Sequence, residues 1–79
     1  APDDVARRAD RVVQTVRTLG ADVLLFSSGH FLRTLAARWL GLPPGAGAQF
    51  LLSTASLSAL GYDHGLDEPV LRLWNRVDF

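Results

Sequence analysis

The sequence predicts an α/β fold whose elements follow the order α-β-α-β-β. Three observations lead to this class. An apolar helical stripe runs through residues 4–19, and a continuous apolar run at residues 23–26 passes directly into a second helical pattern. Alternating segments in the last third of the chain are typical of paired strands. A strand that leads through a turn of small residues into a helix is characteristic of open α/β sheets.

The first predicted helix covers residues 4–19. Asp3 is expected to be its N-cap, because a carboxylate accepts hydrogen bonds from the free N–H groups of the first turn. Gly20 fits the position just after the helix, where a left-handed backbone is common. The apolar residues recur at spacings of four, three, four and three and so form one stripe: Val5, Ala9, Val12, Val16 and Leu19.

The run Val23-Leu24-Leu25-Phe26 predicts a strand. It is continuously apolar, as is typical of a central strand that is covered on both faces. A second helix is predicted over residues 31–40, since Gly41 and Pro43 follow in the usual order for a helix end. The side chains expected to point inward from this helix are those of Leu32, Leu35, Ala36 and Trp39.

Residues 43–49 are expected to form a loop, and residues 56–62 and 70–77 two strands around a turn at 63–68. These elements are too few to supply both edges and both faces of a buried strand. We therefore expect residues 1–79 to be a single partial domain. Its sheet would be completed by a missing N-terminal portion or by a second copy of the chain. The absence of any Met, the initiator included, also favours a piece of something longer.

Composition excludes several kinds of function. The 79 residues allow one domain at most, and the formal net charge of zero gives no electrostatic argument for a nucleic-acid partner or an anionic membrane. The chain has no Cys, which excludes disulfides, thiolate metal sites and thiol nucleophiles. No signal peptide and no membrane span are recognisable. We expect a cytoplasmic protein without membrane association, and its two separated His residues do not suggest a metal site.

The turn Ser27-Ser28-Gly29-His30 is the candidate functional site, because it lies between the predicted strand and the second helix. Its free N–H groups and the positive end of the helix dipole point to the same place, which favours a bound anion. Ligands of open α/β sheets also bind at the carboxyl ends of strands. Ser28, Gly29 and His30 are therefore predicted to surround an anion such as phosphate.

These residues also carry a family resemblance. Residues 26–42, FSSGHFLRTLAARWLGL, resemble the second catalytic segment of the histidine phosphatase superfamily, the phosphoglycerate-mutase-like proteins. They are most similar to the acid-phosphatase-like branch, where the segment reads roughly F-S-H-G-H-F-x-R and then A-x-R-W-L-x-L. Residues 2–13, 50–58 and 61–65 are similar to the flanking helix, strand and turn. The resemblance covers nearly the whole chain and implies the C-terminal part of a three-layer sheet fold.

The resemblance implies phosphoester hydrolysis or phosphoryl transfer on a small phosphorylated metabolite, without a metal or other cofactor. In the family a His attacks the phosphoryl group, paired Arg side chains and a second His hold the phosphate, and an acid protonates the leaving group. Here Ser28 occupies the position of the second His, and the Arg-His-Gly motif of the nucleophile is absent. A hydroxyl donates one hydrogen bond to phosphate but carries no positive charge near pH 7. We therefore expect the chain to be inert on its own.

Three alternatives stay open for Ser28. In the first, the chain is a non-enzymatic pseudoenzyme segment that binds phosphate or a partner chain. In the second, it is an engineered inactive variant of an active phosphatase. In the third, Ser28 simply fills a tight turn. A fourth reading, the nucleophile elbow G-x-S-x-G of α/β-hydrolases, fails because Leu25 is too bulky two residues before Ser27.

The neighbouring residues allow more than one interpretation. Gly29 permits a positive φ or the close approach of a ligand to the backbone, and it equally suits any tight strand-to-helix turn. His30 either caps the second helix or contacts the ligand. Arg33 faces either the pocket or solvent, and solvent is favoured because long charged side chains are usually exposed. His64, in Asp63-His64-Gly65, is interpreted as a turn residue.

Overall fold

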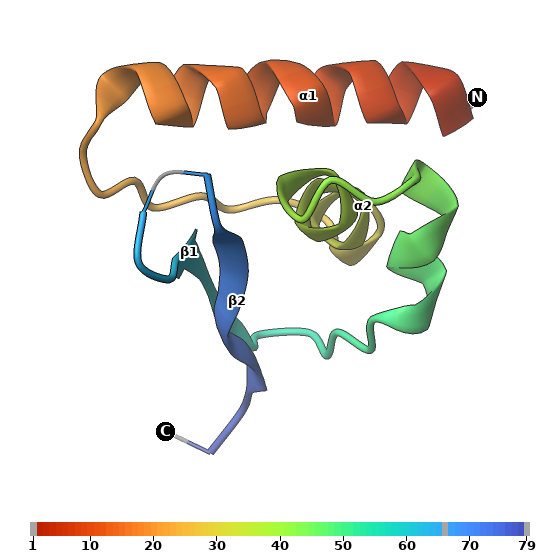
Figure 1. Cartoon of the computed structure of the whole chain (residues 1–79). Helices are drawn as coiled ribbons and strands as arrows, with labels where there is room; N and C mark the ends of the chain where they lie inside the picture. Colours follow the sequence, from red (N-terminus) through yellow and green to blue (C-terminus); the bar gives the residue numbers. More distant parts are fainter. Residues whose placement is uncertain (1, 66, 79) are drawn as a thin grey trace.

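The structure is a computed structural model that describes residues 2–65 and 67–78. These residues form two helices, a short 3₁₀ helix and a β-hairpin (Figure 1). The elements are listed in chain order: α1 (Pro2–Leu19), α2 (Gly29–Trp39), η1 (Pro44–Gln49), β1 (Leu57–Tyr62) and β2 (Pro69–Arg76). Figure 1 shows α1 across one side of the molecule, with α2 and the hairpin beneath it. The predicted α/β class is confirmed, whereas the predicted order of elements needs one correction.

That correction concerns residues 23–26, which do not form a strand here. They lie in an extended segment that leads from α1 to α2, and no described residue pairs with their backbone. Their side chains are exposed, to 72% for Leu24 and 87% for Phe26, so the expected cover on both faces is also absent. A strand needs a neighbour to accept and donate its backbone hydrogen bonds, and the described part of the chain supplies none.

Helix α1 follows the predicted apolar stripe. Ala9 is fully buried against α2, whereas Leu19, at the end of the stripe, is 61% exposed and so does not join the core. The helix begins at Pro2, so Asp3 lies within its first turn instead of capping it, where its charge still favours the helix dipole. Gly20 ends the helix with a φ of +61°, the left-handed conformation expected there. Neither described helix combines the length and the apolar character needed to cross a bilayer.

Helix α2 forms the centre of the core. Small side chains on it allow neighbouring elements to approach closely, and Gly41 follows it with a φ of +77°, as predicted. Leu32, expected to point inward, is only half-buried. The buried residues of the helix are Thr34, Leu35, Ala36, Ala37 and Trp39.

Residues 44–49 form the 3₁₀ helix η1 and not the expected loop. The structure places Pro44 at the first position of η1, where its fixed φ suits a helical turn and its missing N–H costs no hydrogen bond. Gly47 presses against α2 so closely that a Cβ there would lie 2.7 Å from the carbonyl oxygen of Arg33. This packing places η1 beside the first turns of α2.

Strands β1 and β2 form an antiparallel hairpin whose bounds agree with the prediction to within one residue. The register shifts on both sides of Ala59, which makes the pairing irregular. Asn75 takes a positive φ of +58° in this region, and its backbone N–H donates to the Ser58 hydroxyl at 2.9 Å. Its side-chain oxygen accepts from the backbone N–H of Ser53 at 2.7 Å. The first of these bonds joins the two strands where their pairing is irregular, and the second ties the segment before β1 to β2.

An aromatic cluster joins the hairpin to both helices. The rings of Trp39 and Tyr62 have centres 5.1 Å apart, and the indole N–H of Trp39 donates to the carbonyl oxygen of Gly61 at 3.0 Å. The guanidinium of Arg17 lies over both rings, 5.5 Å from the centre of Trp39 and 5.8 Å from that of Tyr62. Cation–π attraction therefore adds to the apolar contact between α1, α2 and β1.

Candidate functional site

Ser28 is the N-cap of α2. Its backbone is extended, with φ −71° and ψ 153°, and its hydroxyl oxygen accepts from the backbone N–H of Phe31 at 3.3 Å. The Ser28 carbonyl accepts from the N–H of Leu32 at 3.0 Å. Ser28 thus satisfies two backbone donors of the first turns. The capping role that we considered for His30 belongs to Ser28 instead.

The N–H groups of Gly29 and His30 stay free of acceptors within residues 2–65 and 67–78. Both residues are exposed, and a Cβ built on Gly29 would meet no atom within 4 Å. The φ of Gly29 is not positive, which leaves two interpretations, the close approach of a ligand to the backbone and a simple turn residue. Free donors, open space and the positive end of the α2 dipole therefore coincide at this point.

A hollow of about 410 Å³ adjoins this helix end, and we refer to it below as the hollow. His30, Arg33 and Thr34 of α2 form one wall, while Val5 of α1 and residues 44–48 of η1 supply much of the rest. Arg33 is half-buried and lines this wall, and its backbone carbonyl faces Gly47 of η1. The 3₁₀ helix packs beside the first turns of α2 and turns that face of the helix into a wall.

The Ser28 hydroxyl has no imidazole partner in the described part of the chain. Its one hydrogen bond there is the capping bond to Phe31. A serine nucleophile needs an adjacent base to take its proton, so this geometry also argues against Ser28 acting like a hydrolase nucleophile.

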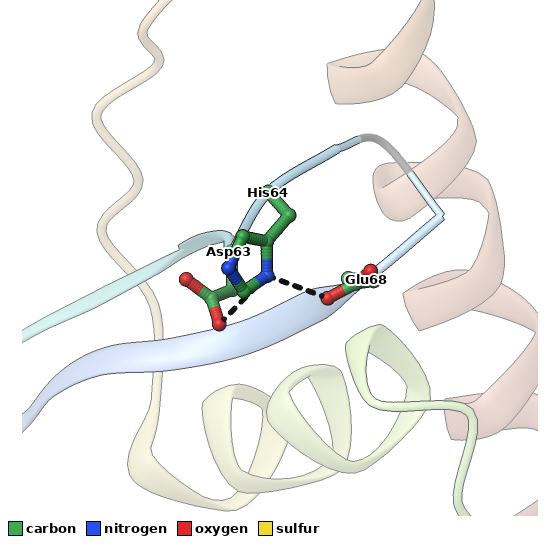
Figure 2. A group of neighbouring side chains, drawn as sticks. All are labelled: Asp63, His64 and Glu68. Carbon is green, nitrogen blue, oxygen red and sulfur yellow. Dashed lines mark hydrogen bonds and ion pairs between the residues drawn. The ribbon is translucent and has the colours of Figure 1, made fainter.

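His64 lies in the turn between β1 and β2, as expected. Figure 2 shows its ring between two carboxylates, with Nδ1 3.1 Å from Oε2 of Glu68 and 3.2 Å from Oδ2 of Asp63. One ligand atom from each of these three exposed residues lies within 4.8 Å of the others, an arrangement that could hold a metal ion. This cluster was not predicted from the sequence, where its signal is a carboxylate one residue before the His and another four residues after it. None of the three residues lines the hollow.

The structure thus brings Ser28, Gly29, His30 and Arg33 together at one end of α2 and leaves His64 in the hairpin turn. Comparison with known proteins agrees with the resemblance seen in this segment. The family model of the histidine phosphatase superfamily (branch 1) matches residues 1–77. The chain belongs to this superfamily.

One curated relative supports the same family. The chain is similar to an acid phosphatase of Mycobacterium tuberculosis (strain ATCC 25618 / H37Rv), with 44% identity over 45 residues. These residues are 57% of this chain and 22% of that protein, so the chain matches only about a fifth of its relative. No solved structure matches the chain significantly. At the level of the family, the chain is phosphatase-like.

Proposed function

We propose that the chain contributes the phosphate-binding end of α2 to a histidine-phosphatase-like domain that acts on a small phosphorylated metabolite. The observation that carries this proposal is the pair of free N–H groups at Gly29 and His30 beside open space. They lie in the segment that resembles the family's second catalytic segment. Phosphoester hydrolysis or phosphoryl transfer is the chemistry that the family and the acid phosphatase relative favour.

Ser28 sets the level of activity in this proposal. It stands where the family has its second catalytic His, and its hydroxyl oxygen already accepts the capping bond from Phe31. The hydroxyl proton is still available to one phosphate oxygen, but no positive charge is offered. Loss of such a group from an electrostatic site costs about 10²–10³ in rate. Because the Arg-His-Gly nucleophile is also absent, the chain by itself is inert.

A pseudoenzyme segment is the second candidate, and one observation favours it. The Ser28 side chain caps α2 and so stabilises the turn. A turn of this kind can bind an anion without catalysing a reaction. In this alternative the segment binds phosphate or a partner chain. The two candidates share the anion position and differ only in whether a nucleophile is supplied from elsewhere.

The rest of the sheet comes from outside the described residues in either case. Residues 23–26 present an unpaired backbone with exposed apolar side chains, as a strand does when its neighbours are missing. We propose that a missing N-terminal portion or a second copy of the chain supplies those neighbours. The match to only 22% of the acid phosphatase relative is consistent with the first source.

Titration of the isotope-labelled chain with inorganic phosphate tests the anion position. The amide resonances of Gly29 and His30 should shift most, because these N–H groups are free and lie at the positive end of α2. Sodium chloride at equal ionic strength is the control for general screening. Shifts confined to other parts of the chain would contradict the proposed site.

The role of Ser28 can be tested by restoring the family His. Ser28→His in the chain alone should leave hydrolysis of an aryl phosphate at background, since one His does not build the site. Fused to a family N-terminal portion that carries Arg-His-Gly, Ser28→His should exceed the Ser28 form by about 10² or more, mainly in kcat. Equal rates for the two well-folded fusions would mean that Ser28 does not occupy the catalytic position.

A further inference from the structure

We infer that the turn between β1 and β2 is a Zn²⁺ site, with Asp63, His64 and Glu68 as its protein ligands. None of these residues lines the hollow, so the inference does not depend on the proposed function. An ion held there would crosslink the two ends of the hairpin turn and would take no part in phosphate chemistry.

The ligand atoms already lie close enough to share one ion. Nδ1 of His64 is 3.1 Å from Oε2 of Glu68 and 3.2 Å from Oδ2 of Asp63 (Figure 2). Zn²⁺ binds nitrogen and oxygen at about 2.0–2.2 Å in a tetrahedral arrangement, so neighbouring ligand atoms of one ion are about 3.3–3.6 Å apart. The observed separations therefore need to change little when an ion enters.

A proton satisfies this cluster less well than a metal ion does. Nδ1 of an imidazole carries one hydrogen at most, whereas two carboxylates face it here. Within residues 2–65 and 67–78, no Arg forms an ion pair with Asp63 or Glu68. A divalent cation supplies positive charge to both carboxylates and bonds to all three ligand atoms.

The set of donor atoms distinguishes Zn²⁺ from the alkaline-earth cations. Imidazole nitrogen together with carboxylate oxygen suits Zn²⁺, whereas Ca²⁺ takes six to eight oxygen ligands and Mg²⁺ keeps an octahedral shell of oxygens. One nitrogen and two carboxylates therefore favour zinc. The three side chains are each more than half exposed, which leaves the fourth position of a tetrahedral ion open to water.

The hairpin fixes the positions from which the ligands project. Tyr62 and Pro69 are paired across the two strands just before the turn. The backbone N–H of Asp63 donates to the carbonyl oxygen of Glu68 at 3.0 Å, and the N–H of Glu68 donates to that of Gly65 at 3.0 Å. Backbone bonds thus bring the two carboxylate residues together without the ion, so little ordering is needed when zinc binds.

Titration of the chain with zinc chloride tests the site. Calorimetry should show one ion per chain, and the amide resonances of Asp63, His64 and Glu68 should shift first. Zinc should also raise the temperature of thermal unfolding, because the ion binds the folded turn. Calcium and magnesium chloride at the same concentrations are the controls and should produce neither effect.

His64→Asn removes the imidazole, and Asn tolerates the left-handed backbone that His64 adopts with a φ of +57°. Zinc affinity should fall about tenfold or more, since loss of a residue that only orients a ligand already costs about 10–100-fold. Asp67→Asn is the matched charge control, because Asp67 lies in the same turn but outside the cluster. His30→Asn removes the other His of the chain, and both controls should retain the affinity of the unmodified chain.

Three results would overturn the inference. They are the absence of zinc binding to the unmodified chain, affinity that is unchanged in His64→Asn, and affinity that falls as much in Asp67→Asn as in His64→Asn. If His64→Asn does not fold by circular dichroism, Glu68→Gln takes its place with the same expected loss. Resonance shifts centred on His30 instead of the hairpin turn would also overturn it.

Discussion

Arg38 of α2 holds the carboxylate of Asp10 of α1 in a two-pronged contact. Its Nε donates to Oδ1 at 2.7 Å and one Nη donates to Oδ2 at 3.2 Å, while the other Nη donates to the carbonyl oxygen of Leu42 at 3.2 Å. The hydrogen bond and the charge of Asp10 raise the pKa of Arg38 against the opposing effect of partial burial. One guanidinium thus joins α1, α2 and the segment that follows α2.

Arg38→Gln should lower the free energy of unfolding by about 1 kcal/mol, the upper end for a partly exposed ion pair, because it also loses the bond to Leu42. Asp10→Asn should lower the free energy of unfolding by less, since it leaves the bond to Leu42 in place.

The pH dependence of this contact follows from the raised pKa of Arg38. The contribution of Arg38 to stability is complete below the usual Arg pKa and is lost only above the pKa in the folded state. Urea unfolding between about pH 6 and pH 9 should therefore show no change that originates from Arg38.

Arg11→Gln is the matched control for Arg38→Gln, because Arg11 is exposed and forms no hydrogen bond, ion pair or ring contact with another described residue. A double variant of Asp10 and Arg38 should show coupling between the two sites. Strictly additive losses would mean that the observed fork contributes nothing to stability.

Gly47→Ala should destabilise the chain by about 1–3 kcal/mol, the usual cost of overpacking. A Cβ at Gly47 would lie 2.7 Å from the Arg33 carbonyl oxygen and 3.1 Å from the Thr34 nitrogen, and backbone atoms of a helix cannot move aside. Gly45→Ala in the same 3₁₀ helix is the control, since a Cβ there meets no atom within 4 Å. Urea unfolding that gave equal midpoints for the two variants would show that η1 does not pack on α2 as described.

Ser28→Ala should cost about 0.5–2 kcal/mol of stability, because the N–H of Phe31 loses its acceptor. Ser28→Asp should retain the cap and add a favourable charge at the start of α2. Ser27→Ala is the local control and should change stability by less than about 0.5 kcal/mol, because no described residue bonds to the Ser27 side chain. Thermal unfolding of the three variants tests whether Ser28 is a helix cap. If Ser28 merely fills the turn, all three variants should have the same unfolding temperature.

Sedimentation of the purified chain should show dimers or larger assemblies, because residues 23–26 expose apolar side chains and an unpaired backbone. Replacing Leu24 and Phe26 together by Lys should shift the population towards monomer. Leu51→Lys is the control, since Leu51 is 79% exposed but lies outside the segment. A wild-type chain that sediments as a monomer would contradict the proposed missing neighbours.

The sequence by itself determined α1, α2, the hairpin and the family. The stripe that includes Ala9 predicts α1, Gly20 and Gly41 mark the two helix ends, and the motif at residues 26–42 carries the family resemblance. These features were predictable because each depends on residues close together in the chain. Helix periodicity and left-handed glycine ends are local preferences that survive in the folded molecule.

Only the tertiary structure decided the state of residues 23–26 and the place of Arg33. The apolar run is compatible with a buried strand, but strand pairing needs backbone partners distant in sequence, and the described chain has none for it. The position of Arg33 on α2 was predictable, whereas the wall it joins exists because Gly47 lets η1 approach that helix. The arrangement of His64 with Asp63 and Glu68 likewise depends on the turn that folds Glu68 back towards it. Each of these outcomes depends on contacts between segments that are brought together only in the folded chain. Local sequence preferences do not encode such contacts.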